Sequence, residues 1–96
     1  MKKTEREKTP EIYKVIYRLK RWKTKSERYF TGFSVTEAFN DFHYAFVSGH
    51  VNSDRVTIHK IERYDRFADR WYDETSCIGG DHENVTVSRG KIILNR

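Results

Sequence analysis

One segment near the middle of the chain has the pattern of an amphipathic helix with a single apolar side. Ser34-Val35-Thr36-Glu37 matches a capping box, in which Ser34 accepts a hydrogen bond from the backbone near Glu37 and Glu37 reaches back. Apolar residues then recur at helical spacing: Val35, Ala38, Phe39, Phe42, Ala45 and Phe46. Gly49 is placed to end the helix in a left-handed cap. We therefore predict one helix, from about Val35 to Ser48.

The residues before this helix alternate between polar and apolar, which indicates β-strands. In the stretch 12–22, one face carries Tyr13, Val15, Tyr17 and Leu19. Residues 23–27 form a polar tract that suits a hairpin loop, and the aromatic-rich stretch 28–33 should return as a second strand. A helix with one apolar stripe must lie on one face of an antiparallel sheet. The pattern therefore predicts an α+β fold.

The chain continues after the helix with a third predicted strand over residues 56–64. Its alternation slips near His59–Ile61, where we expect a β-bulge. Residues 63–73 fit both a helix and a strand, and we favour a continued or bent strand with a turn around Phe67–Asp69. Residues 75–84, which include Gly79-Gly80, read as a loop.

Two short apolar runs near the C-terminus, 85–87 and 92–94, flank Ser88-Arg89-Gly90-Lys91 and read as a closing hairpin. The expected order is β-β-α-β-(β)-β. It corresponds to an antiparallel sheet of four to five strands with the single helix packed on one face.

Ninety-six residues suit a single domain, which we place at 12–96, with 1–11 as a flexible charged tail. The single cysteine, Cys77, excludes an internal disulfide and favours a reducing compartment. No apolar run approaches the roughly 20 residues of a membrane span, and the N-terminus lacks the apolar core of a secretory signal. We expect a cytoplasmic protein with no membrane partner.

Positive charge is concentrated in the first predicted hairpin. Residues 14–28 contain seven Lys and Arg and one acidic residue, Glu27, whereas residues 29–54 contain neither Lys nor Arg. If the helix covers one sheet face, the other presents cations around Trp22, with Phe30 expected beside them. Cations next to flat rings suit RNA or DNA, although a solvated polar face explains the same pattern. The candidate nucleic-acid-binding residues are Lys14, Arg18, Lys20, Arg21, Trp22, Lys23, Lys25 and Arg28.

A second candidate surface lies within residues 55–72, where basic and acidic residues alternate and aromatic residues stand between them. Tyr, Trp and Arg are enriched at interface hot spots, although self-neutralising charge pairs on a solvated surface are the commoner explanation. The surface would suit a protein partner, with the chain acting as an adaptor or inhibitor of the kind that phages or mobile elements encode, or a homodimer. Its candidate residues are Arg63, Tyr64, Arg66, Phe67, Arg70 and Trp71.

Catalytic and metal chemistry have weak support in the sequence. Cys77 precedes Asp81 and His82, but structural zinc sites usually show paired ligands such as CxxC. A nucleophilic cysteine needs a thiol of low pKa with a neighbouring base, which most lone cysteines lack. No Walker or dinucleotide-binding spacing follows Gly79-Gly80. We therefore expect a binding protein without enzymatic activity, cofactor or metal.

Overall fold

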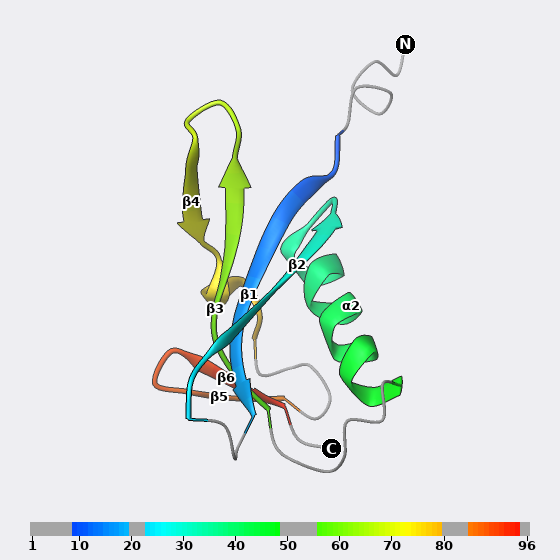
Figure 1. Cartoon of the computed structure of the whole chain (residues 1–96), viewed down its shortest axis with the longest axis vertical. Coiled ribbons are helices and arrows are strands. Elements are labelled where there is room, and N and C mark those ends of the chain that lie inside the picture. Colours follow the sequence, from blue (N-terminus) through cyan, green and yellow to red (C-terminus); the bar gives the residue numbers. More distant parts are fainter. Residues whose placement is uncertain (1–8, 20–22, 49–55, 80–84, 95–96) are drawn as a thin grey trace.

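A computed structural model describes residues 9–19, 23–48, 56–79 and 85–94 of the chain. These ranges contain one α-helix, one short 3₁₀ helix and six strands (Figure 1). In chain order the elements are β1 (Glu11–Leu19), β2 (Ser26–Gly32), α2 (Val35–Ser48), β3 (Val56–Asp65), β4 (Arg70–Asp73), η1 (Thr75–Cys77), β5 (Val85–Ser88) and β6 (Lys91–Leu94).

The strands form one antiparallel sheet in the order β2-β1-β3-β6-β5, and β4 pairs with β3 beside this path. Helix α2 crosses one face of the sheet (Figure 1). The predicted α+β fold is confirmed, and so is the helix from Val35 to Ser48. The ambiguous stretch 63–73 forms the end of β3, a turn and the whole of β4, and β4 is the sixth strand.

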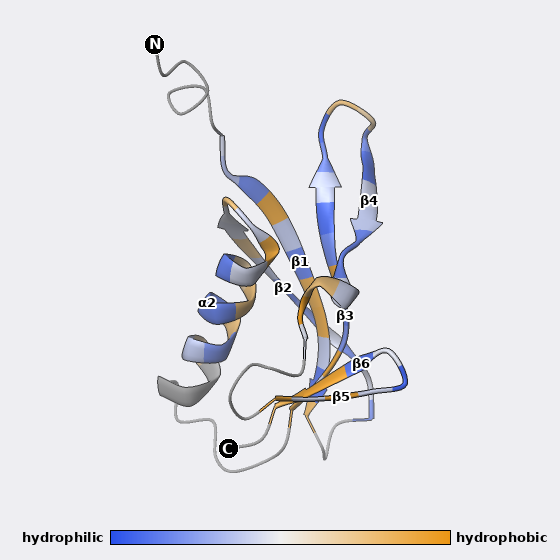
Figure 2. Cartoon of the chain, turned by 180° about the vertical axis from the view of Figure 1, so that it is seen from behind, coloured by the Kyte–Doolittle hydropathy of each residue, from blue (hydrophilic) through white to orange (hydrophobic). Residues whose placement is uncertain are grey.

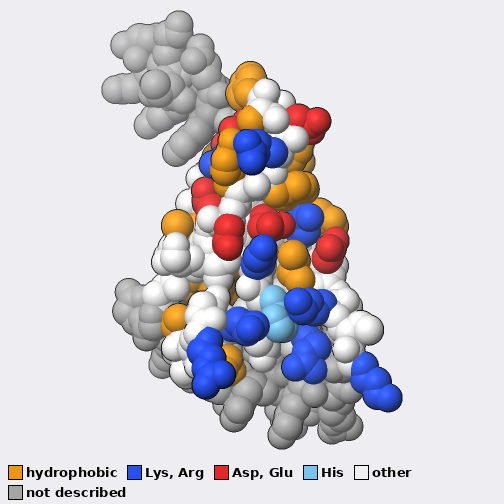
Figure 3. Space-filling view, turned by 90° about the vertical axis from the view of Figure 1, so that its left-hand side faces the viewer, with side chains coloured by type: hydrophobic (Ala, Val, Ile, Leu, Met, Phe, Trp, Pro, Cys, Tyr) orange, Lys and Arg blue, Asp and Glu red, His pale blue; other side chains and the backbone are white. Residues whose placement is uncertain are grey.

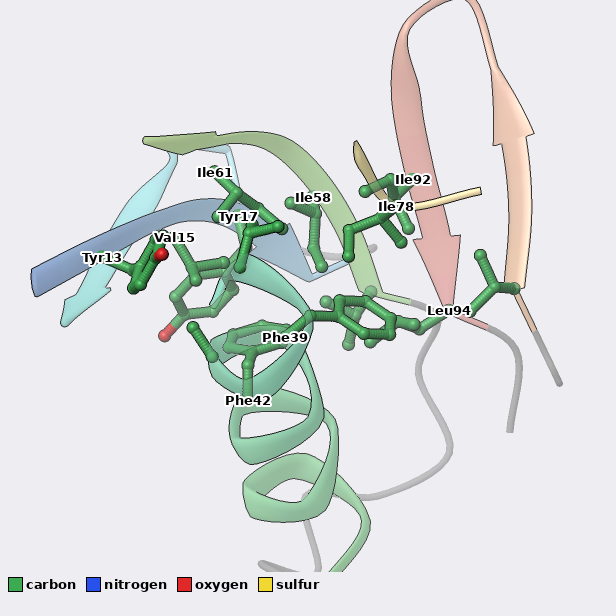
Figure 4. Close-up of a cluster of buried hydrophobic side chains, with 14 of the residues drawn as sticks. Tyr13, Val15, Tyr17, Phe39, Phe42, Ile58, Ile61, Ile78, Ile92 and Leu94 are labelled. Carbon is green, nitrogen blue, oxygen red and sulfur yellow. The ribbon is translucent and has the colours of Figure 1, made fainter. Parts of the chain in front are cut away.

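The core lies between the sheet and α2. Alternate residues of β1, beginning at Tyr13, point into it, while the apolar side of α2 faces the sheet (Figure 2). Phe42 makes an edge contact with Tyr17, with ring centroids 5.1 Å apart, and packs against Phe30 at 6.0 Å. Figure 4 shows the labelled members of this core: Tyr13, Val15, Tyr17, Phe39, Phe42, Ile58, Ile61, Ile78, Ile92 and Leu94.

The predicted capping box lies at the start of α2, but one of its two hydrogen bonds has a different partner from the one expected. Ser34 Oγ accepts from the backbone N–H of Glu37 at 3.2 Å. The Glu37 carboxylate accepts from the backbone N–H of Phe33 at 2.8 Å, one residue before the cap. Gly32 makes room for it, because a Cβ at this position would lie 2.8 Å from Glu37 Oε1. The predicted cap at Gly49 lies outside the described residues.

The predicted bulge in β3 is confirmed at His59. Opposite β1, Ile16 pairs with Lys60 and the next residue, Tyr17, pairs with Ile58. His59 therefore has no counterpart on β1. Such an extra residue locally changes the twist of the strand and the direction of its side chains.

Two hairpins complete the sheet. The β3–β4 turn falls where we expected it and is held by Asp65 Oδ1, which accepts from the backbone N–H groups of Phe67 and Ala68. The β5–β6 hairpin, also predicted, turns at Arg89 and Gly90, whose φ angles are 54° and 76°. Two consecutive positive φ values are typical of a type I′ turn, which matches the twist of the flanking strands.

No helix within the described ranges is long and apolar enough to cross a membrane. Of the predicted tail, residues 1–8 lie outside the described part of the chain, and β1 begins at Glu11.

Candidate nucleic-acid interface

The sheet face opposite α2, which we call the open face, is defined by the strand register. Residues directly opposite each other in antiparallel strands share a face. Lys14 has Tyr29 of β2 on one side and Glu62 of β3 on the other, and Tyr64 of β3 faces Trp71 of β4. Four strands thus contribute to one surface.

Three rings gather at one end of the open face, and we call Tyr29, Tyr64 and Trp71 the aromatic cluster. The ring centroid of Trp71 lies 5.1 Å from that of Tyr64 and 6.1 Å from that of Tyr29. Lys14 Nζ stands 4.4 Å from the Trp71 centroid, a cation–π distance. Tyr29 is 56% exposed, so part of the cluster is open to a ligand.

The tyrosine hydroxyl groups of this cluster donate to nearby carboxylates. Tyr64 donates to Asp69 at 2.6 Å, and Tyr29 donates to Glu27 at 2.9 Å. These hydrogen bonds are the main cause of a raised pKa in both tyrosines. Both phenols therefore stay protonated at neutral pH, and each bond holds its ring in place over the sheet.

Lys14 is engaged within the sheet. Its Nζ lies 3.6 Å from Glu62 Oε1, and the two side chains are only 16% and 17% exposed. Its charge is therefore balanced by Glu62 and directed at the Trp71 ring. The ammonium group of Lys14 therefore helps to hold the Trp71 ring in place, and little of the Lys14 side chain is exposed to solvent.

A pocket of about 510 Å³ opens on the other half of the open face, and we call it the basic pocket. Figure 3 shows Lys and Arg side chains gathered around a histidine on this face. The residues that line it are Ile16, Lys25, His59, Lys60, Asp73, Arg89, Gly90 and Lys91. Four of them are Lys or Arg and one is a carboxylate, so the pocket is electropositive.

His59 reaches this pocket because it is the bulged residue of β3. Its Nε2 is buried and has no hydrogen-bond partner among the described residues. Burial is the main cause of a lowered pKa, and the nearby charges of Lys25, Lys91 and Arg18 lower it further. The imidazole is therefore neutral at pH 7.

Asp73 is the carboxylate of the pocket, and it accepts two hydrogen bonds from Thr75. Its Oδ1 accepts from the hydroxyl group of Thr75 and, at 2.9 Å, from the backbone N–H of the same residue. These two bonds lower the pKa of Asp73. The carboxylate thus stays ionised, and its Oδ1 already accepts two hydrogen bonds.

The residues predicted from the first hairpin are distributed unevenly. Lys25 lines the basic pocket, Arg18 is close enough to act on His59, and Lys23 is exposed in the loop before β2. Arg28 lies opposite Val15, on the helix side of the sheet. The remaining three candidates, Lys20, Arg21 and Trp22, lie outside the described residues.

One expectation about this face is wrong. Phe30 lies opposite the buried Tyr13 and packs against Phe42, so it belongs to the core and not to the open face. Its neighbour Tyr29 occupies the expected position beside Lys14. The period of a strand is two, so a prediction that is out by one residue selects the opposite face.

The second predicted surface is divided between the two faces of the β3–β4 hairpin. Tyr64 and Trp71 belong to the aromatic cluster of the open face. On the other face, the Cζ atoms of Arg63 and Arg70 each lie 5.4 Å from the Tyr72 ring centroid. The turn contains the last two candidates, Arg66 and Phe67, and Phe67 is 94% exposed.

The first-hairpin prediction did not include the pocket residues His59, Lys60, Arg89 and Lys91. The slip in alternation at His59 was a usable signal, because bulges redirect side chains and are common near functional sites. The Arg-Gly turn predicted at 89–90 was the other signal. Neither could show that the turn would lie beside β3, since that depends on pairing between β3 and β6.

Metal ligands are not grouped in the described part of the chain, where no cluster of three or more His, Cys, Asp or Glu could hold an ion. Cys77 is exposed, and the other two residues of that sequence motif, Asp81 and His82, lie outside the described residues.

In comparisons with known proteins, no family model, no curated protein and no solved structure matches this chain.

Proposed function

We propose that this protein binds RNA or DNA in single-stranded form on the open face, without catalysing a reaction. In this proposal the basic pocket, Arg18 of β1 and Lys23 of the β1–β2 loop contact phosphates, and bases stack on the aromatic cluster. Single-strand binding commonly combines these two parts, a positively charged surface and aromatic platforms. The cytoplasmic location expected from the sequence is part of the same proposal.

The observation that carries the proposal is that the two parts share one face along the same strands. Ile16 lines the basic pocket and Lys14 lies under Trp71. The two residues are separated by one residue on β1, so their Cα atoms are about 7 Å apart along the strand. A short stretch of nucleic acid could therefore reach both the pocket and the rings.

Charge on this face also supports an anionic partner. Glu62 is paired with Lys14, and the pocket combines four cations and a neutral histidine with a single carboxylate, Asp73. Contacts between cations and phosphates release counterions, so the affinity should fall steeply with salt concentration.

Fluorescence anisotropy with labelled single-stranded RNA, single-stranded DNA and duplex DNA tests the proposal at low and physiological salt. We expect Lys25→Glu/Lys60→Glu to abolish binding at physiological salt. Trp71→Ala should weaken it by about 1–3 kcal/mol, the usual worth of one stacked base. The matched control is Arg28→Glu/Arg70→Glu, which changes the net charge equally on the helix side of the sheet.

Two results would contradict the proposal. One is binding that appears only at low salt or not at all. The other is an equal loss of binding in the pocket variant and in the helix-side control, because it would show that only the net charge matters.

A protein-binding module is the second candidate function, supported by the exposure of Phe67 at the tip of the β3–β4 hairpin. Exposed aromatic residues beside arginines are typical interface anchors. For this candidate, Phe67→Ala or Arg66→Ala should abolish capture of a partner in a pull-down, and raised salt should matter less. Phe67→Ala is the cleaner of the two variants, because Arg66 lines a pocket together with Tyr64 of the aromatic cluster.

A further inference from the structure

The basic pocket differs from an ordinary basic surface in how its charges are grouped. Its cations come from three separate parts of the fold: Lys25 from the β1–β2 loop, Lys60 from β3, and Arg89 and Lys91 from the β5–β6 hairpin. They surround one depression together with His59 and a single carboxylate. Like charges grouped in this way repel one another, and an anion bound among them reduces that repulsion.

A phosphodiester and a terminal phosphate differ in how well they match this grouping. An internal phosphodiester carries one negative charge, and its strand must continue in both directions. A phosphate monoester carries about 1.5 to 2 negative charges at pH 7 and presents three strong acceptor oxygens. Four cations around one pocket suit the monoester better.

We propose that the basic pocket binds the terminal phosphate monoester of a nucleic-acid strand, while the adjoining base stacks on Trp71. This inference rests on the proposed function and assigns the pocket to a chain end, 5′ or 3′. The short separation along β1 between the pocket and Lys14, on which Trp71 stacks, suits a phosphate and the base of the same or the next nucleotide.

The pKa of the His59 imidazole should report whether a phosphate occupies the pocket. The charged groups that face it or share its pocket are Arg18 of β1, Lys25 of the β1–β2 loop, Lys60 of β3, Asp73 of β4, and Arg89 and Lys91 of the β5–β6 hairpin. An incoming dianion offsets the cations, so the imidazole pKa should rise when the pocket is filled. By linkage, binding takes up a proton, and affinity should increase as the pH falls through the interval between the pKa of His59 in the filled pocket and its lower pKa in the empty pocket.

The experiment compares one single-stranded oligonucleotide sequence in three forms: with hydroxyl groups at both ends, with a 5′-phosphate, and with a 3′-phosphate. Competition anisotropy measures their affinities for the full chain. We expect one phosphorylated form to bind about tenfold to a hundredfold more tightly than the hydroxyl form, as charge-assisted hydrogen bonds imply. Lys60→Gln/Lys91→Gln should remove this preference, whereas the helix-side pair Arg28→Gln/Arg70→Gln should keep it.

Proton NMR of the histidine rings provides the second readout. The preferred phosphorylated oligonucleotide should raise the pKa of His59 and leave the signal of His43, on α2, unchanged. His59→Gln should keep the preference for the phosphorylated end and lose the part of the pH dependence that His59 contributes, leaving that of the phosphate itself, whose second pKa is about 6.

The outcomes separate the two proposals. Equal binding of all three forms would overturn the terminal-phosphate inference and leave the proposed function standing. Binding of none of them at physiological salt would overturn both. A preference for a phosphorylated end that survives in Lys60→Gln/Lys91→Gln would place the phosphate elsewhere and overturn the pocket assignment.

Discussion

At the scale of single residues, Thr75 shows how one buried hydroxyl group joins the end of β4 to the centre of the sheet. Its Oγ1 accepts from the backbone N–H of Ile61 at 3.0 Å and donates to Asp73. Ile61 is fully buried, and its carbonyl accepts from the backbone N–H of Glu74 at 2.8 Å. The hydroxyl group therefore satisfies a β3 donor that water cannot easily reach.

Thr75→Val keeps the shape of the side chain but leaves the Ile61 N–H without its acceptor. We expect the free energy of unfolding to fall by about 1–3 kcal/mol, the penalty for a buried unpaired group. Thr75→Ser, which keeps the hydroxyl group, should cost less, and urea denaturation of both variants makes the comparison. Equal midpoints for the two variants would mean that the hydrogen bond does not stabilise the fold.

Tyr29 and Phe30 show what single residues could and could not reveal in the sequence. Both are aromatic, and either could have stood beside Lys14. The register with β1 decides between them, because it places Phe30 opposite Tyr13 in the core and Tyr29 opposite Lys14. That register depends on how the whole hairpin packs under α2, which local alternation in β2 does not specify.

At the scale of elements, α2 is the part of the fold whose boundaries follow most directly from local chemistry. The backbone N–H groups at its N-terminus need acceptors. The Ser34 side chain accepts from the N–H of Glu37, and the Glu37 side chain accepts from the N–H of Phe33. Its apolar stripe then determines which side faces the sheet. All of these interactions join residues three or four apart, or closer, so they are visible in the sequence.

Ser34→Ala removes the cap and should destabilise the protein by about 1 kcal/mol. Ser34→Asp should retain most of the stability, because a carboxylate also accepts at this position and is favoured by the helix dipole. Thermal unfolding followed by circular dichroism measures both variants. Loss of stability in Ser34→Asp as large as in Ser34→Ala would argue against a capping role.

The β3–β4 hairpin is the opposite case at this scale, since its sequence fitted a helix as well as a strand. Its strand form is stabilised by pairing with β3 and by the Asp65 turn, together with contacts of Trp71 to Tyr64 and Tyr29. The contact with Tyr29 joins residues more than forty positions apart in the chain. Long-range packing therefore decided an element that local propensity left open.

At the scale of the whole molecule, the two faces of the sheet differ in what they carry. The helix side buries the core, and the open face holds the aromatic cluster and the basic pocket. Burial is the main cause of the lowered pKa of His59, and the cations around it lower this pKa further. The stability of the fold should therefore depend on pH.

The sign of that effect follows from proton linkage. His59 has a folded-state pKa below 6.5, so between that pKa and about 6.5 the unfolded chain binds more protons than the folded chain. The free energy of unfolding should therefore rise with pH through this window and become level above it. Asp73, whose pKa is lowered below 3.8, adds stability that is lost only in stronger acid.

Urea denaturation between about pH 5 and pH 7.5 tests this dependence. We expect the wild-type protein to lose stability as the pH falls below about 6.5, and His59→Gln to show a flatter profile in this range. His43→Gln, which replaces a histidine of α2 away from the basic pocket, is the matched control. An unchanged slope in His59→Gln would show that another group controls the dependence.

By itself, the sequence determined the α+β class, helix α2, the buried side of β1, a bulge near His59–Ile61 and the β5–β6 hairpin. These features depend on spacings of two to four residues or on the residues of a single turn. Only the tertiary structure decided which surfaces exist. It joined Tyr29, Tyr64 and Trp71 into one cluster and placed Lys25, Lys60, Arg89 and Lys91 around His59. Pairing between distant strands creates such sites, and its register is a property of the packed sheet as a whole.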